Sequence, residues 1–155
     1  MHPHFIPAEP QDAPTLSAIA WRAKQHWGYP EEWMQLWRAE LTILPEYIEG
    51  NEVIKVMHEG QLAGFYALEY HEKYTCTQIG HFWIEPHYMG KGFGRKAFEH
   101  LMAQLKSNGE GRLIIEADPY AAGFYERMGA VQIGRLESSI AGRYLPVYEI
   151  LVEKG

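Results

Sequence analysis

A chain of 155 residues can form one domain with a sizeable core. Its 46% hydrophobic and 22% charged residues are typical of a globular protein, and a net charge of −6 disfavours nonspecific binding to nucleic acid. The single cysteine, Cys76, excludes an internal disulfide, and no stretch approaches the roughly 18 apolar residues of a membrane span. Since the N-terminus carries no secretion signal, we expect a cytoplasmic protein with one domain, residues 1–155, and neither a membrane nor a nucleic-acid partner.

The first third of the chain predicts one strand and two helices. His4 to Ala8 can form a short strand. Asp12 is a candidate N-cap for a helix that ends near Gly28. Pro30 opens a second helix, in which the apolar residues are Trp33, Met34, Trp37 and Leu41.

The rest of the chain alternates strands and helices. Strands over 53–57 and 62–68 flank Glu59-Gly60-Gln61 and predict a hairpin. A strand over 78–85 leads into a glycine-rich loop and then a helix that stops at Asn108-Gly109. The elements expected after it are a strand over 113–117, a helix over 120–128, and strands over 131–136 and 147–152.

The glycine-rich loop is Met89-Gly90-Lys91-Gly92-Phe93-Gly94-Arg95-Lys96. Glycines at alternate positions let a backbone approach a ligand closely. The helix start presents free N–H groups and a positive dipole end, which the three cations of the loop oppose. A bound polyanion would relieve this conflict, so the loop predicts a phosphate site. Arg95-Lys96 after the last glycine excludes both a P-loop and a dinucleotide fingerprint.

A second motif follows, Asp118-Pro119-Tyr120-Ala121-Ala122-Gly123-Phe124-Tyr125-Glu126-Arg127-Met128-Gly129-Ala130. Together the two motifs resemble the signatures of the GCN5-related N-acetyltransferase (GNAT) superfamily, in a bacterial branch of it. The matching positions are Gly92, Gly94, Ala121, Phe124, Tyr125, Glu126 and Gly129. Met89 stands where the family usually has Gln or Arg, Asp118 where it has Asn, and Ala130 where it has an aromatic residue.

The resemblance implies a single-domain α/β fold with a mixed, mostly antiparallel sheet flanked by helices. The sheet would open between strands 78–85 and 113–117 to admit the pantetheine arm of acetyl-CoA. The implied activity is acetyl transfer from acetyl-CoA to a small-molecule or peptide amine by direct attack in a ternary complex. The implied CoA contacts are Trp83, Ile84, Met89, Gly90, Lys91, Gly92, Phe93, Gly94, Arg95, Lys96, Asp118 and Phe124.

Three residues are the main candidates for proton transfer. By the resemblance, Tyr125 lies beside the CoA sulfur and protonates the leaving thiolate, with a packing role as the alternative. His81, on the strand expected to carry the thioester, titrates in the useful range and is one candidate base. Glu116, at the end of the next strand, is another. A water chain without a dedicated base is the third alternative. Weaker candidates for the base are Glu69, His71 and Glu85.

Several features leave the acceptor open. The aromatic residues of the first two helices can form a cage for a cation or part of the core, and we favour the core except at the turn Trp27-Gly28-Tyr29. We expect Arg143 to be solvated rather than to meet a substrate carboxylate. The eight histidines include no metal-binding pair, so we expect no metal. The alternative function is a sensor that binds CoA or acyl-CoA without turnover, and the chain can be a monomer or a homodimer.

Overall fold

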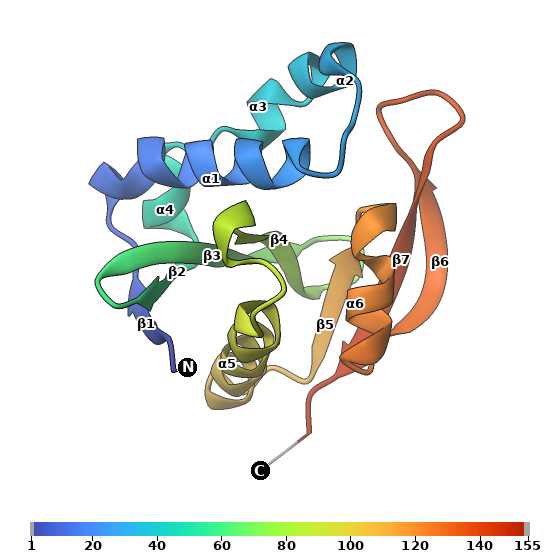
Figure 1. Cartoon of the computed structure of the whole chain (residues 1–155). Coiled ribbons are helices and arrows are strands. Elements are labelled where there is room, and N and C mark those ends of the chain that lie inside the picture. Colours follow the sequence, from blue (N-terminus) through green and yellow to red (C-terminus); the bar gives the residue numbers. More distant parts are fainter. Residues whose placement is uncertain (1, 154–155) are drawn as a thin grey trace. The chain divides into compact units, whose positions relative to one another are not determined.

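The structure is a computed structural model that describes residues 2–153 (Figure 1). The chain forms two compact units. The first unit runs to Leu68 and resumes with Gly80–Ala97, and the second comprises Glu69–Ile79 and the chain from Phe98 onward. Within the described residues, no helix is long and apolar enough to cross a membrane.

Within residues 2–153, seven strands form one sheet in the order β1-β2-β3-β4-β5-β7-β6. Their bounds are β1 His4–Pro7, β2 Glu52–His58, β3 Gln61–His71, β4 Cys76–Ile84, β5 Arg112–Glu116, β6 Val131–Glu137 and β7 Tyr144–Leu151. β4 and β5 run parallel, whereas β1 and β2, β2 and β3, β5 and β7, and β6 and β7 pair antiparallel. The expected mixed, mostly antiparallel sheet is confirmed.

In the described part of the chain, six helices accompany the sheet: α1 Ala13–Gln25, α2 Glu31–Leu36, α3 Arg38–Leu41, α4 Pro45–Gly50, α5 Phe93–Ser107 and α6 Ala122–Arg127. Short 3₁₀ turns lie at Pro10–Asp12, Pro86–Tyr88 and Pro119–Ala121.

The first unit carries helices on both faces of its strands. α1 buries Leu16, Ile19, Ala20 and Ala23, as its helical spacing predicts. The start of α5 buries Phe93 and Ala97 in a cluster with Val56 and Ala63, and Phe82 and Ile84 of β4 pack against that cluster. Because successive strand residues point to opposite faces, His81 and Trp83 lie on the other side of β4.

Three local features of the first unit differ from the sequence expectations. Asp12 precedes α1 but caps none of its amides, because its carboxylate accepts from the Glu9 N–H at 2.8 Å and pairs with Lys55 at 3.0 Å. The helix expected from Pro30 is interrupted at Trp37 and forms α2 and α3. α4 has no counterpart in the sequence prediction, since it buries only Ile48 and so lacks an apolar repeat.

The second unit is organised around β5. Leu113, Ile114 and Ile115 are all buried, which explains the continuous apolar run in this strand. β5 pairs with β7 along its whole length, from Arg112↔Leu151 to Glu116↔Val147. Its ladder with β4 in this unit consists of Thr77↔Leu113 and Gln78↔Ile114. The wider opening of the sheet between these strands stays a prediction.

α5 and α6 pack against each other in the second unit through aromatic rings. The Phe98 ring centroid lies 6.0 Å from that of Phe124 and 6.2 Å from that of Tyr125. α5 ends as predicted at Asn108-Gly109, where Gly109 has a φ of +75° and the Glu110 N–H donates to the Leu105 carbonyl.

Candidate functional site

The glycine-rich loop follows β4 directly and is anchored at its strand end. The Glu85 N–H donates to the Ala63 carbonyl at 2.8 Å, and a 3₁₀ turn over Pro86–Tyr88 follows. Gly90 and Gly92 then adopt φ values of +74° and +86°, a region that favours glycine. The expected loop between β4 and the following helix is present, and the close approach of its backbone to a ligand stays a prediction.

The N-terminus of α5 lies at the end of this loop. The first helical hydrogen bond runs from the Lys96 N–H to the Gly92 carbonyl at 3.1 Å. The amides of Phe93, Gly94 and Arg95 precede that bond and belong to the positive end of a 15-residue helix. This arrangement is an anion-binding geometry.

Open space surrounds the two positive-φ glycines. A Cβ atom built on Gly90 or Gly92 would meet no protein atom within 4 Å. Lys91, Arg95 and Lys96 are all exposed. In the part of the chain that the structure describes, none of these three cations has an ion-pair partner. The loop therefore offers accessible backbone and uncompensated positive charge together.

Phe93 belongs to the core as well as to the loop. Its side chain is 2% exposed, and its ring lies 5.1 Å from that of His58 and 5.4 Å from that of Tyr88. Phe93 can therefore meet a ligand only through its backbone. The ring anchors the helix start to the sheet.

His81 and Trp83 form a hydrogen-bonded pair on one face of β4. The Trp83 Nε1–H donates to His81 Nδ1 at 2.9 Å. Burial lowers the pKa of His81 to about 4, far below its ordinary value. Their spacing of two in a predicted strand places both side chains on one face, which is the signal in the sequence for this contact.

Glu85, a weaker candidate base, is held by α1. Its two carboxylate oxygens accept from Arg22 Nε at 2.7 Å and Arg22 Nη2 at 2.6 Å. The hydrogen bond with Glu85 raises the pKa of Arg22, and the charge of Glu85 adds to the effect. This two-point ion pair occupies the carboxylate and ties α1 to the strand end from which the loop starts.

Tyr125 lies in the second unit on α6. Its side chain is 5% exposed, and its ring lies 5.4 Å from that of Phe124. Burial raises the pKa of Tyr125 well above its ordinary value, and the charge of Asp118 adds to this. The phenol is therefore protonated at neutral pH and can serve as a proton donor.

Asp118 caps the 3₁₀ turn that precedes α6. Its carboxylate accepts from the Tyr120 N–H at 2.9 Å and from Arg143 Nη2 at 3.1 Å. The side chains of Asp118 and Arg143 are 8% and 13% exposed. The expectation of a solvated Arg143 is wrong, because the late loop turns this guanidinium onto Asp118. Its partner lies 25 residues earlier, a distance at which local patterns give no signal.

Glu116 and His71 form an imidazole–carboxylate pair that the sequence does not indicate. His71 Nε2 lies 2.9 Å from Glu116 Oε2, although 45 residues separate them. The side chain of Glu116 is 33% exposed and that of His71 is 12% exposed. His71 Nδ1 is buried and has no hydrogen-bond partner within the described chain. Glu116 is thus the accessible member of the pair. The other weak candidate, Glu69, lies within 3.4 Å of Gln78 Nε2.

The aromatic residues after α1 surround a lysine of the protein itself. Lys24 Nζ lies 4.2 Å from the Trp37 ring centroid and 5.3 Å from that of Tyr29. Trp37 is 3% exposed, and the Trp33 ring lies 6.0 Å from both Tyr29 and Trp37. The cluster packs internally and already holds a cation, which supports the core interpretation.

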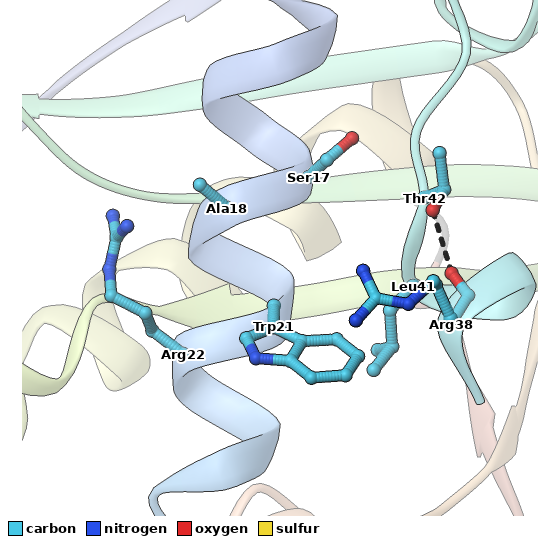
Figure 2. A pocket seen from close by; sticks show the side chains of 7 residues that line it. All are labelled: Ser17, Ala18, Trp21, Arg22, Arg38, Leu41 and Thr42. Carbon is cyan, nitrogen blue, oxygen red and sulfur yellow. Dashed lines mark hydrogen bonds between the residues drawn. The ribbon is translucent and has the colours of Figure 1, made fainter. Parts of the chain in front are cut away.

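A cavity of about 290 Å³ opens beside α1 and α3 in the first unit (Figure 2). Its lining residues are Ser17, Ala18, Trp21, Arg22, Arg38, Leu41 and Thr42. The Arg38 guanidinium lies 4.5 Å from the Trp21 ring centroid, and the Thr42 hydroxyl donates to the Arg38 carbonyl at 2.7 Å. No residue predicted for CoA binding or proton transfer lines this cavity.

Among residues 2–153, no group of three or more His, Cys, Asp or Glu side chains is placed to hold a metal ion.

Comparison with known proteins identifies the family of the chain. Residues 14–130 match the model of the acetyltransferase (GNAT) family. No curated protein matches the sequence.

Solved structures share the fold at low sequence identity. A GCN5-related N-acetyltransferase from Rhodopseudomonas palustris aligns with a TM-score of 0.79 and 22% identity, over 96% of this chain and 95% of the other. The PaiA N-acetyltransferase of Thermoplasma acidophilum, in complex with coenzyme A, aligns with a TM-score of 0.72 and 16% identity, over 96% and 98%. The ribosomal-protein-S18-alanine N-acetyltransferase of Escherichia coli gives 0.73 and 17%, over 99% and 96%. At these identities the similarity shows the fold.

Proposed function

The chain belongs to the acetyltransferase (GNAT) family, and from that premise we propose that it transfers the acetyl group of acetyl-CoA to an amine by direct attack in a ternary complex. One observation carries the proposal. The glycine-rich loop combines two positive-φ glycines, the N-terminus of α5 and three cations that have no ion-pair partner among residues 2–153. This combination supports a pyrophosphate site, and the coenzyme A bound to the Thermoplasma acidophilum protein supports the same ligand here.

The proposed cofactor is acetyl-CoA, held mainly by backbone. The amides of Phe93, Gly94 and Arg95 would donate hydrogen bonds to the pyrophosphate oxygens. The side chains of Lys91, Arg95 and Lys96 would neutralise the charge of those oxygens. Met89 at the Gln or Arg position of the motif removes one polar side chain and leaves these amides unchanged.

The reaction requires one proton to leave the amine and another to reach the sulfur. A lysine-like amine has a pKa near 10.4, so deprotonating it at about pH 7.4 requires about 4 kcal/mol. The neutral nitrogen attacks the thioester carbon, and the C–S bond of the tetrahedral intermediate then breaks. We assign Tyr125, the tyrosine of the second motif, as the acid that protonates the departing thiolate, since its phenol is protonated at neutral pH.

We assign Glu116 as the base that receives the amine proton. His71 Nε2 holds one of its oxygens at 2.9 Å, and the side chain keeps 33% exposure. The second oxygen can accept a proton directly or through water. The hydrogen bond from His71 would orient the carboxylate.

The proposed acceptor is a small-molecule or peptide amine. The Escherichia coli neighbour is a ribosomal-protein-S18-alanine N-acetyltransferase, which supports a protein or peptide amine as one class of acceptor. The net charge of −6 weakly favours a cationic acceptor in the present chain.

Replacement of Tyr125 tests the proposal. Release of CoA thiol would be followed with DTNB across amines, amino acids, aminoglycosides and peptide N-termini, and acetyl-CoA affinity by calorimetry. Tyr125→Phe removes one hydroxyl, so we expect wild-type affinity and a fall in kcat of roughly 10²-fold. Tyr148→Phe is the matched control, because this buried tyrosine donates to Glu126 Oε2 at 2.6 Å and has no assigned role in proton transfer.

Two outcomes would contradict the proposal. A kcat within twofold of wild type in Tyr125→Phe, with chemistry rate-limiting, would exclude Tyr125 as the acid. Tight acetyl-CoA binding without turnover of any acceptor would instead support the sensor function.

A further inference from the structure

The hydrogen bond between Trp83 and His81 determines which nitrogen of the histidine ring carries the proton. An indole nitrogen can only donate a hydrogen bond. The 2.9 Å contact from Trp83 Nε1 to His81 Nδ1 therefore requires a lone pair on Nδ1. A neutral imidazole has one N–H, and with Nδ1 as acceptor that proton lies on Nε2.

The surroundings of His81 keep the ring neutral. Rings from three elements pack around it, with centroids at 5.5 Å for Tyr47 of α4, 5.9 Å for Phe65 of β3 and 6.4 Å for Trp83 of β4. The Trp27 ring in turn lies 6.0 Å from that of Trp83. Apart from the Tyr47 phenol, these groups carry no titratable atom. Burial lowers the pKa of His81 to about 4, so the ring stays neutral between about pH 5 and 8.

The second ring nitrogen is the one left for a ligand. Within the described residues, His81 Nε2 has no hydrogen-bond partner, although aromatic rings pack around the imidazole. If the neutral ring acted as a base through Nε2, its one hydrogen would have to lie on Nδ1, where it would point at the Trp83 N–H. Two donors would then face each other, which removes one hydrogen bond and leaves two buried N–H groups opposed.

We propose that Trp83 locks His81 in the neutral Nε2–H form, so that His81 donates a hydrogen bond to an oxygen of the bound substrate and does not act as the base. This inference rests on the proposed acetyl transfer for the identity of the substrate. It assigns a positioning role to a residue that the sequence presents as a candidate base, and it leaves proton abstraction to Glu116.

The form of the His81 ring can be measured without turnover. Long-range ¹H–¹⁵N correlation spectra of protein labelled at histidine distinguish an Nε2–H ring from an Nδ1–H ring, and the His81→Gln spectrum assigns the His81 signals. We expect the Nε2–H form, unchanged between about pH 5 and 8. Trp83→Phe keeps an aromatic ring but removes the N–H, so the His81 signal should shift toward a mixture of both forms. Trp27→Phe, one ring further away, should leave it unchanged.

Kinetics then tests the donor role. Glutamine offers a carbonyl oxygen toward Trp83 and an N–H₂ donor beyond it, but it does not titrate. We expect His81→Gln to retain kcat/KM within about threefold with the acidic limb of its pH profile intact, and His81→Ala to lose at least about tenfold. If His81 were the base, both variants would lose about 10²-fold or more and the acidic limb would disappear.

Stability against pH gives a third readout. A histidine with a lowered pKa binds its proton more tightly in the unfolded chain than in the folded protein. Its contribution therefore makes the free energy of unfolding fall as the pH drops from about 6.5 toward about 4. His81→Gln should lack that component.

Each result bears on the proposal. An Nδ1–H ring, or protonation near pH 6.5 in the wild type, would overturn it. So would wild-type kinetics in His81→Ala. Failure of the acetyltransferase assay with an Nε2–H ring would instead count against the proposed function alone.

Discussion

Gly92 combines a backbone conformation that glycine favours with open space above it. Its φ is +86°, and a built Cβ meets no protein atom within 4 Å. We expect Gly92→Val to weaken acetyl-CoA binding at least tenfold, about 1.4 kcal/mol, because a β-branched residue resists this φ and its methyl groups would fill the space over the loop. Titration calorimetry with acetyl-CoA measures the change.

Gly60 provides a matched control for the loop experiment. It has a φ of +76°, similar open space, and a place in the turn between β2 and β3. Gly60→Val should therefore strain the backbone comparably while leaving acetyl-CoA affinity unchanged. Wild-type affinity in a folded Gly92→Val protein would contradict the phosphate assignment.

At the residue scale, backbone roles were more predictable than side-chain partners. Alternate glycines before a helix indicate a loop directly, and the structure shows positive φ at Gly90 and Gly92 within it. The partners of Glu116 and Arg143 were not predictable, because each lies more than twenty residues away and is brought close only by the sheet. The burial of the Phe93 ring was not predicted either, since the ring packs against Val56 and Ala63 of the sheet at the start of α5.

At the element scale, Gly64 allows β3 and β4 to approach closely. A Cβ built there would lie 2.3 Å from the Trp83 carbonyl oxygen and 2.9 Å from Ile84 Cδ1. Since the first contact is with backbone, a side chain requires the strands to separate. We expect Gly64→Ala to lower the free energy of unfolding by about 1–3 kcal/mol, measured by urea denaturation.

Gly134 of β6 is the strand glycine that serves as a control. A Cβ atom built on it meets nothing within 4 Å, and its φ is not in the left-handed region. Gly134→Ala should leave the free energy of unfolding within about 0.5 kcal/mol of the wild-type value. An equal loss of stability in both variants would show that crowding at Gly64 is not the cause.

The strands and the long helices could be placed from the sequence, whereas α4 and the break between α2 and α3 could not. The strand expected over 78–85 is β4, Cys76–Ile84, and the stop of α5 at Asn108-Gly109 is confirmed. α4 buries one residue, so it has no apolar repeat from which it could be predicted. The interruption between α2 and α3 could not be predicted either, because Trp37 fits the apolar pattern of a continuous helix although its backbone leaves the helical region.

At the scale of the whole molecule, three elements pass from one unit into the other. β3 crosses after Leu68, β4 after Ile79 and α5 after Ala97. Unfolding one unit alone would interrupt two strands and the longest helix, at the expense of their hydrogen bonds. We therefore propose that residues 1–155 behave as one domain and expect a single cooperative transition in urea. Two separate transitions by circular dichroism would contradict this.

The distribution of tryptophan gives that experiment a second, local signal. All five tryptophans, Trp21, Trp27, Trp33, Trp37 and Trp83, belong to the first unit. Intrinsic fluorescence excited at the indole band therefore reports on that unit alone, whereas far-ultraviolet dichroism averages over both. In a cooperative domain, the two signals should give the same urea midpoint and slope. We therefore expect indole emission to change when acetyl-CoA binds at the proposed loop site, since that loop shares a unit with every tryptophan of the chain.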